Sequence, residues 1–241
     1  MQATDSSNHG KFGYHLRTLK EFVELDPTTK KYHLTHRGEI LDSVIQDFRF
    51  ITPTHNEYEE YVQQLEPGDH AMGCYETEQF RHKISFPYLK AGLSKGEAVF
   101  HVVSEQKLYS EIRELKRYMV DTDYLVPKGA LTIESSDEWF MKKGKGQPET
   151  IIVNLRKIAQ EKRKAGFSGT RGAVEMGLMF DYDSSKLMRL ESMLGRQFGF
   201  SFCGFCLFET NRLGSKQFAQ LCKCHGHLIS KGILGKTILG S

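Results

Sequence analysis

The stretch TRGAVEM at residues 170–176, with its counterpart FSFCGFCLFE at residues 200–209, decides how this chain folds. Both are short, nearly continuous apolar runs that reach a carboxylate, Glu175 or Glu209, near their C-terminal ends. Such runs are typical of strands that are buried on both faces of a parallel sheet and surface at its C-terminal edge. Because open α/β sheets bind ligands at that edge, the two carboxylates are candidate ligand contacts.

Strand-like and helix-like segments alternate along residues 70–229. The strands are short apolar runs, and the helices repeat apolar residues every three or four positions. Because alternating strands and helices form right-handed crossovers, this order predicts an α/β fold with a mostly parallel sheet covered by helices on both faces. The further predicted strands are 70–75, 98–103 and 130–134, and the predicted helices are 105–119, 149–164, 184–198 and 215–229.

The bulk composition is that of an ordinary soluble protein. Of the 241 residues, 39% are hydrophobic and 26% charged, which is enough for a packed core and a solvated surface. The net charge of +3 is too small to predict nucleic-acid binding by itself. The sequence has no apolar run of membrane-spanning length and no apolar signal core, so we expect a cytoplasmic protein with no membrane partner and with its five cysteines reduced.

The first fifty residues predict a small segment of a different kind. Residues 9–20 have the pattern of a helix with an apolar stripe and a basic opposite face. Two short strands at 23–25 and 32–34, joined by a turn that contains proline, predict a β-ribbon. Thr35 is a candidate N-cap for a following helix whose apolar stripe continues through Phe48.

Two stretches of this segment, YHLRTL at 14–19 and KYHLTHRG at 31–38, resemble the recognition helix and wing of archaeal ArsR-like winged-helix regulators. The helices that normally precede the recognition helix are missing, so the resemblance is to a partial winged helix. It implies DNA as a partner. The alternative is a solvated helix face, because seven acidic residues balance the seven basic residues of positions 1–50. The candidate DNA contacts are Lys11, His15, Arg17 and Lys20.

A connecting helix is predicted between this segment and the α/β region. Pro53 ends the preceding helix, and residues 56–65 carry a new apolar stripe. The sequence EPGD at 66–69 then interrupts the helical pattern. The expected organisation is a partial winged helix at 1–50, a connecting helix at 51–65 and a sensory domain at 66–241.

Five stretches of the α/β region form a recognisable series: GDH at 68–70, FPYLKAGLSKGEA at 86–98, RGAVEM at 171–176, RLE at 189–191 and CLF at 206–208. In this order they resemble the MEDS family, the sensory domain named for methanogens and methylotrophs. The resemblance runs from about residue 64 to about residue 230 and implies a RecA/KaiC-like α/β fold that has lost nucleotide hydrolysis. It also implies a role in sensing small molecules, proposed to be hydrocarbon derivatives, in proteins that carry winged helices or signalling modules.

The position of a phosphate-binding loop carries the wrong residues for nucleotide hydrolysis. A RecA-like ATPase needs glycines and a lysine after its first strand, where backbone amides wrap the phosphates. Residues 74–80 read CYETEQF, which supplies carboxylates instead. We therefore expect no catalytic residues and no cofactor. An enzyme on a RecA-like fold, binding a nucleotide or using Glu175 with Asp181 or Asp183 around a metal ion, stays the alternative.

Several polar side chains near the predicted strands are candidate ligand contacts. Glu175 matches the resembled family motif, and the bland alternative is a buried structural carboxylate paired with Arg171 or with backbone amides. Cys206 is a candidate soft apolar wall of the pocket. Joint metal binding by Cys203 and Cys206 is not expected, because residues three apart on a strand face opposite sides. The candidate ligand-binding residues are His70, Glu76, Arg171, Glu175, Cys206 and Glu209.

The stretch CKCHGH at 222–227 resembles a metal cluster, but a helix would spread its ligands over two sides. Gly226 leaves open that the helix ends there. No metal site is therefore expected. Trp139 and Phe140 follow the third predicted strand and either cover a hydrophobic ligand or pack in the core.

The sequence thus predicts a non-catalytic sensor of a small molecule, working in a transcriptional regulator or signalling protein. The candidate partners are the small molecule, DNA and a second copy of the chain. A stand-alone sensor that acts through a protein partner is the further alternative.

Overall fold

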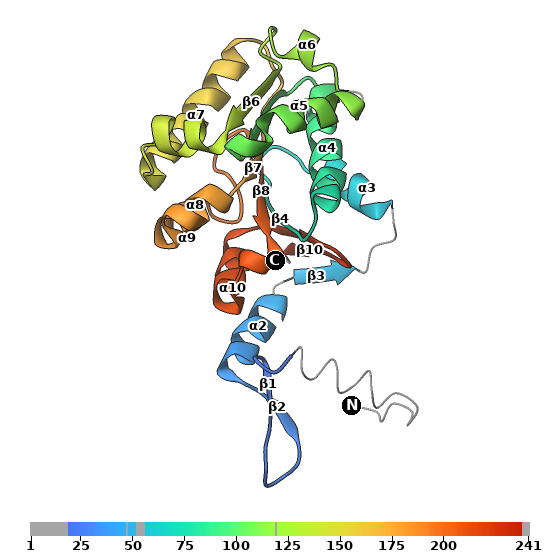
Figure 1. Cartoon of the computed structure of the whole chain (residues 1–241), viewed down its shortest axis with the longest axis vertical. Helices are drawn as coiled ribbons and strands as arrows, with labels where there is room; N and C mark the ends of the chain where they lie inside the picture. The colour runs from blue at the N-terminus through green and yellow to red at the C-terminus, as the bar shows by residue number, and fades with distance from the viewer. Residues whose placement is uncertain (1–18, 47, 52–55, 119, 238–241) are drawn as a thin grey trace. The chain divides into compact units, whose positions relative to one another are not determined.

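The computed structural model describes residues 19–46, 48–51, 56–118 and 120–237, and the chain divides into two compact units, residues 1–48 and 49–241 (Figure 1). The predicted DNA contacts Lys11, His15 and Arg17 lie outside the described residues. Lys20 is described and is exposed.

The first unit contains the predicted β-ribbon and the helix after it. Strand β1 (Val23–Leu25) pairs antiparallel with β2 (Tyr32–Leu34), and helix α2 (His36–Gln46) follows. The Thr35 hydroxyl accepts a hydrogen bond of 3.1 Å from the backbone N–H of Gly38, which confirms the predicted N-cap. The helix ends earlier than expected, because Phe48–Ile51 forms strand β3 of the large sheet.

The second unit is built on an eight-stranded sheet with the order β3-β10-β9-β4-β8-β7-β5-β6. Strands β4 to β9 pair in parallel, and β10 pairs antiparallel with β9 and lies between β9 and the edge strand β3. The predicted mostly parallel sheet is therefore confirmed. The strands are β4 (His70–Tyr75), β5 (Ala98–Val103), β6 (Leu131–Ser135), β7 (Thr170–Glu175), β8 (Phe202–Glu209), β9 (His227–Ser230) and β10 (Ile233–Thr237).

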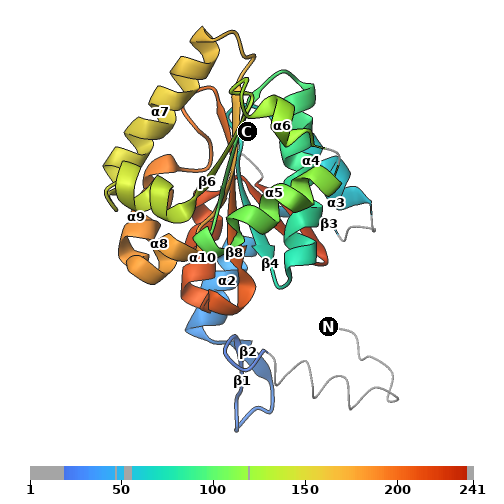
Figure 2. The same cartoon turned by 45° about the horizontal axis from the view of Figure 1, so that its top comes forward.

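Helices cover both faces of the sheet, as the sequence predicted (Figure 2). Because the chain moves outward from β4 to β6 and then back from β6 to β9, right-handed crossovers put the two sets of helices on opposite faces. One face carries α3 (Glu57–Gln63), α4 (Glu78–Ser94), α5 (Leu108–Arg117) and α6 (Thr122–Leu125). The other carries α7 (Pro148–Lys164), α8 (Gly177–Tyr182), α9 (Ser184–Leu194) and α10 (Ser215–Cys224).

The predicted connecting helix forms as α3 and packs against α4. Its Tyr58 and Val62, together with Leu65 after the helix, are buried in the main hydrophobic cluster of the sheet unit. This helix is thus part of the core of the second unit. Within the described ranges, none of the helices is both long enough and apolar enough to cross a membrane.

The last predicted helix, 215–229, is wrong in its second half. Helix α10 ends at Cys224, and His225 has an extended backbone conformation. Residues 227–230 form β9, which pairs in parallel with β4, so the hydrogen bonds of the sheet outweigh the helical spacing of the apolar residues. This early end of α10 changes where His225 and His227 lie.

Candidate functional site

A polar cleft of about 670 Å³ lies at the C-terminal edge of the sheet. It is formed where β4, β5, β7 and β8 end, so Tyr75, Ser104, Glu175 and Glu209 all line it. The cleft therefore occupies the place where an open α/β sheet binds its ligand.

The lining of the cleft is acidic. Lys107 and Arg212 are its two basic lining residues, whereas six carboxylates line it: Glu78, Glu105, Asp137, Glu175, Asp181 and Glu209. In the first turn of α4, the N–H of Phe80 already donates a hydrogen bond of 3.2 Å to the hydroxyl of Thr77, so this donor is not available to an anion. Glu76 is exposed in the same loop. This arrangement repels the phosphates of a nucleotide, since their negative charge would meet carboxylates.

Glu175 is a buried carboxylate within a network of cations. Its oxygens lie 2.9 Å from Arg81 Nε and 3.1 Å from Lys107 Nζ, and it accepts a hydrogen bond of 3.0 Å from the N–H of Ser104. Glu175 is therefore a buried structural carboxylate that a backbone amide and two cations hold, but neither cation is Arg171.

Arg171 forms a separate ion pair at the other end of β7. Its Nε lies 2.6 Å from Glu97, and its guanidinium donates a hydrogen bond of 2.8 Å to the carbonyl of Leu65. Four residues of strand span about 13 Å, so Arg171 and Glu175 share a face of the sheet without meeting. The branch of the alternative that paired Glu175 with Arg171 is therefore wrong, whereas its other branch, a bond from a backbone amide, is seen at Ser104.

The carboxylates considered for a divalent cation have other partners. Arg212 bridges Glu209 and Asp181, with a distance of 2.6 Å to each. Asp183 caps α9 and accepts hydrogen bonds of 3.0 and 3.1 Å from the N–H groups of Ser185 and Lys186. One oxygen of each of these carboxylates therefore has a partner within the chain.

His70 and Cys206 do not join Glu175 at the cleft, contrary to expectation. His70 is the first residue of β4 and pairs in register with Gly204, which puts Cys206 two residues further along the same face of the sheet. His70 Nε2 lies 3.4 Å from Cys206 Sγ and 3.3 Å from an oxygen of Glu191 on α9. His225, which follows α10, joins the group, and we call these four residues the His70 cluster.

The His70 cluster is fully buried and can hold a metal ion. Burial, and then the nearby His70, lower the pKa of His225 to about 3, so its imidazole is neutral at pH 7. Burial also raises the pKa of the Cys206 thiol well above its usual range. Sequence reasoning did not name Glu191 as a candidate contact, and it considered His225 as a metal ligand only together with its neighbours in the CKCHGH stretch. The signals were present, because Glu191 belongs to the RLE stretch and the glycine after His225 left open the early end of the helix.

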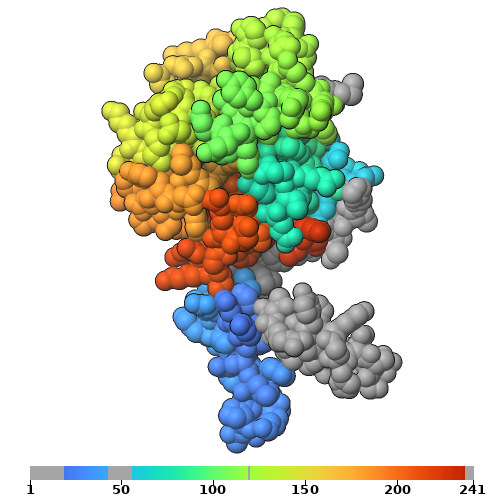
Figure 3. All heavy atoms as spheres, in the orientation of Figure 1, coloured from blue at the N-terminus to red at the C-terminus, as the bar shows by residue number. Residues whose placement is uncertain are grey.

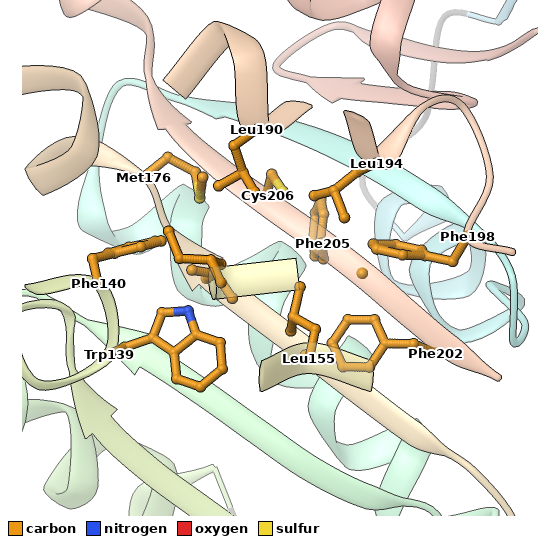
Figure 4. A pocket seen from close by; sticks show the side chains of 14 residues that line it. Trp139, Phe140, Leu155, Met176, Leu190, Leu194, Phe198, Phe202, Phe205 and Cys206 are labelled. Carbon is orange, nitrogen blue, oxygen red and sulfur yellow. The ribbon is translucent and has the colours of Figure 1, made fainter. Parts of the chain in front are cut away.

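An apolar cavity of about 30 Å³ lies between the sheet and the helices on the α7 and α9 face (Figure 4). Figure 4 shows Trp139 and Phe140 on one side of the cavity and Phe198 and Phe202 on the opposite side. Every lining residue is a glycine or has an apolar or sulfur side chain. The lining residues are Trp139, Phe140, Ile151, Leu155, Gly172, Val174, Met176, Leu190, Leu194, Phe198, Phe202, Gly204, Phe205 and Cys206.

Two features of the local sequence shape this cavity. Its floor contains Gly172 and Gly204, which pair across β7 and β8, and a side chain at either position would come within 2.7 Å of a phenylalanine ring. Trp139 and Phe140 belong to η3 (Asp137–Lys143), a π-helix of the kind that is frequent at functional sites. Cys206 lines the cavity and also belongs to the His70 cluster, so the two features share a wall.

Comparison with known proteins gives a family for the sheet unit. A solved structure, the flagellar accessory protein FlaH from Methanocaldococcus jannaschii, is similar with a TM-score of 0.47 and 11% identity, over 75% of this chain and 79% of that one. A search of curated proteins found no match. The family model described as the methanogen/methylotroph, DcmR sensory domain (MEDS) matches residues 69–226, which is more than half of the chain. The chain therefore belongs to the MEDS family of sensory domains.

Proposed function

We propose that this chain is a non-catalytic sensor that binds a small apolar or weakly polar organic molecule in the cavity between η3, α7, α9 and the sheet. Membership of a sensory family supports a sensing role. The observation that carries the choice of site is the lining of the cavity, which contains no charged residue among its fourteen described members. A hydrocarbon derivative would meet carbon and sulfur side chains, glycines and the indole of Trp139 there.

The size of the cavity limits the ligand. About 30 Å³ is roughly two to three times the 10–15 Å³ of open space that one water molecule needs, but an apolar cavity of this kind stays dry. A molecule of one or two carbons, or the end of a short alkyl chain, fits without a large rearrangement. Each Å² of apolar surface that it buries contributes roughly 25 cal/mol to binding.

A longer ligand has to move part of the wall, and η3 is the element best suited to move. It is a π-helix, and the loop after it holds Lys145 and Gly146 at φ values of 54° and 58°. Asp137 at the start of η3 lines the polar cleft, whereas Trp139 and Phe140 line the cavity. A ligand that binds one position of η3 better than another would therefore change the cleft as well.

The fluorescence of Trp139, the single tryptophan of the chain, tests this proposal. We expect straight-chain alcohols or haloalkanes of one to six carbons to change its emission saturably, with the shortest members favoured. Leu194→Ala enlarges the cavity and should shift the preference to longer members. Met193→Ala, at a side chain that is 47% exposed on the same helix, is the matched control. An emission change that never saturates, or the same chain-length preference in Leu194→Ala, would overturn the proposal.

Nucleotide binding at the acidic cleft is the test that separates the sensor from an enzyme that binds a nucleotide. We expect no binding of a non-hydrolysable ATP analogue with magnesium in calorimetry, because six carboxylates line the cleft. Stoichiometric binding of the analogue would favour the enzyme.

We also propose that the N-terminal unit passes the signal to DNA. The β-ribbon, the capped helix α2 and the exposed Lys20 support this output. Fluorescence anisotropy of the full chain with duplex DNA should show affinity that falls as salt rises, and Lys20→Ala should reduce that salt dependence. Lys128→Ala, at an exposed lysine of the sheet unit, is the matched control. Equal salt dependence in Lys20→Ala and wild type would count against Lys20 as a phosphate contact.

A further inference from the structure

We infer that His70, Glu191, Cys206 and His225 form a site for one divalent transition-metal ion, with zinc as the best match. The site offers two imidazoles, one thiol and one carboxylate, which are the ligand types that zinc takes in proteins. Cys206 also lines the proposed cavity, but the metal site is a separate proposal, and its test does not depend on ligand binding in the cavity.

The spacing of the four ligand atoms suits a tetrahedral ion. Oε2 of Glu191 lies 3.3 Å from His70 Nε2, 3.4 Å from His225 Nε2 and 3.9 Å from Cys206 Sγ. All four atoms lie within 4.8 Å of one another. Tetrahedral bonds of about 2.0 to 2.3 Å put ligand atoms roughly 3.3 to 3.8 Å apart. An ion at the centre therefore requires little movement of the side chains.

Backbone carbonyls hold both histidines in the tautomer that a metal requires. His70 Nδ1 lies 2.6 Å from the carbonyl oxygen of Gly195, and His225 Nδ1 lies 2.7 Å from that of Leu221. Because a carbonyl only accepts hydrogen bonds, each Nδ1 carries the proton. Each Nε2 then presents a lone pair to the centre of the cluster, which is the usual outer-shell arrangement of a histidine that binds a metal.

In the described part of the chain, the ion-pair partners of the buried Glu191 carboxylate are histidines, not an arginine or a lysine. Among the described residues, Oε1 of Glu191 is buried without a hydrogen-bond partner, and its Oε2 faces two imidazole lone pairs and one thiol. A buried charge without a partner costs several kcal/mol. A divalent ion removes this cost, because its two positive charges balance one carboxylate and one thiolate. The thiol proton of Cys206 is released to water when the Cys206–metal bond forms.

The site is closed, which predicts a structural ion. Four protein ligands complete a tetrahedron and leave no open position for a substrate. The ligands come from β4, β8, α9 and the segment after α10, so the ion would tie these elements together. Helices α9 and α10 pack against each other, and their side chains adjoin on the surface in Figure 3.

Metal analysis of the whole purified chain tests the inference. After addition of zinc and removal of unbound ions, we expect one equivalent per chain and a coordination shell of one sulfur at about 2.3 Å with three nitrogen or oxygen atoms at about 2.0 Å by X-ray absorption. Replacement by cobalt(II) should give the visible bands of a four-coordinate ion and a thiolate charge-transfer band.

Variants separate this cluster from the other cysteines. Cys206→Ser should abolish the charge-transfer band, and Glu191→Gln should weaken cobalt binding at least tenfold. Cys224→Ser, at a half-buried thiol outside the cluster, should leave both unchanged. The inference is overturned if zinc does not bind stoichiometrically, if the shell of the wild-type protein contains two sulfurs or none, or if Cys224→Ser removes the band. The absorption shell is measured on wild-type protein, so the test holds even if Cys206→Ser fails to fold.

Discussion

The two faces of the central sheet each bury a cluster of histidines and carboxylates, but only one of the clusters contains a permanent cation. On the α4 and α5 face, the guanidinium of Arg81 donates hydrogen bonds of 2.7 and 2.6 Å to the two oxygens of Glu111. His101 Nε2 lies 2.7 Å from the same carboxylate. On the α9 and α10 face, Glu191 instead faces His70, His225 and Cys206.

The difference shows two ways in which a fold can balance the negative charge of a buried carboxylate. We call Arg81, His101, Glu111 and Glu175 the Arg81 cluster. Its arginine supplies both positive charge and hydrogen-bond donors to the carboxylates, so this cluster needs no further cation. The His70 cluster supplies lone pairs and one thiol proton, and it requires charge from outside the chain. Removal of one partner should therefore cost much more stability on the α4 and α5 face than on the α9 and α10 face, and the predictions below use that contrast.

Arg81→Met should have the largest effect. It leaves Glu111 buried without its cation and Glu175 with Lys107 as its remaining cation, and the loss of a buried partner typically costs about 3 to 5 kcal/mol in the free energy of unfolding. Urea denaturation followed by circular dichroism measures the change. Arg113→Met, on the same helix as Glu111 but with a side chain that is 67% exposed, should change stability by less than about 0.5 kcal/mol. Similar losses in the two variants would show that Arg81 is not the cation on which this face depends.

The stability of the protein at acid pH should also depend on this cluster, through the ionisation of Glu111. Burial opposes ionisation of Glu111, but the hydrogen bonds from Arg81, His101 and His82 outweigh it and hold its pKa far below its usual range. Because the folded-state pKa is depressed, the stabilisation is complete above the unfolded pKa of about 4.3 and is lost as pH falls below it.

We expect Glu111 to contribute a loss of about 1.4 kcal/mol per pH unit below that point, or roughly 2.5 kcal/mol by pH 2.5. In Glu111→Gln this contribution disappears, so stability should fall less steeply with acid than in wild type. Denaturation series between pH 2.5 and 7 measure the two slopes. Parallel slopes would mean that Glu111 titrates normally in the folded protein.

The sequence alone predicted the bounds of several strands and the carboxylates at the C-terminal edge of the sheet. The strands predicted at 70–75 and 98–103 have those bounds in the structure, because a strand buried on both faces is a continuous apolar run. For the same reason, the carboxylates of Glu175 and Glu209 could be assigned to the C-terminal edge, where the polar cleft lies.

What the sequence could not supply was which elements meet across the fold. His70 begins its strand, so it lies away from the C-terminal edge, and its contacts come from 121 residues further along the chain at Glu191 and later at His225. The residues of β9 carry helical spacing, and only their pairing with β4 makes them a strand. No local pattern encodes such pairings, and the same limitation applies to the cavity beneath η3.

Glu191→Gln should change the stability of the metal-free protein much less than Arg81→Met does. In protein treated with a chelator, this change removes a buried charge that has no permanent cation, and the new amide can donate to an imidazole nitrogen. We expect a change of less than about 1.5 kcal/mol, in contrast to the loss for Arg81→Met. With zinc added, wild type should gain stability in thermal denaturation and Glu191→Gln should gain much less. A loss of 3 kcal/mol or more without metal would mean that this cluster is complete without an ion.

Lys107→Met should have the smallest effect and mark the outer limit of the Arg81 cluster. Its Nζ lies 2.6 Å from Glu78 and 3.1 Å from Glu175, but the side chain is 32% exposed at the polar cleft. Water already screens this cation, so its loss should cost about 1 kcal/mol or less. Urea denaturation in low and high salt measures the change, and high salt should reduce it further. A cost near that of Arg81→Met, unaffected by salt, would mean that the cluster extends through Lys107 and that the cleft is part of the charge balance on this face.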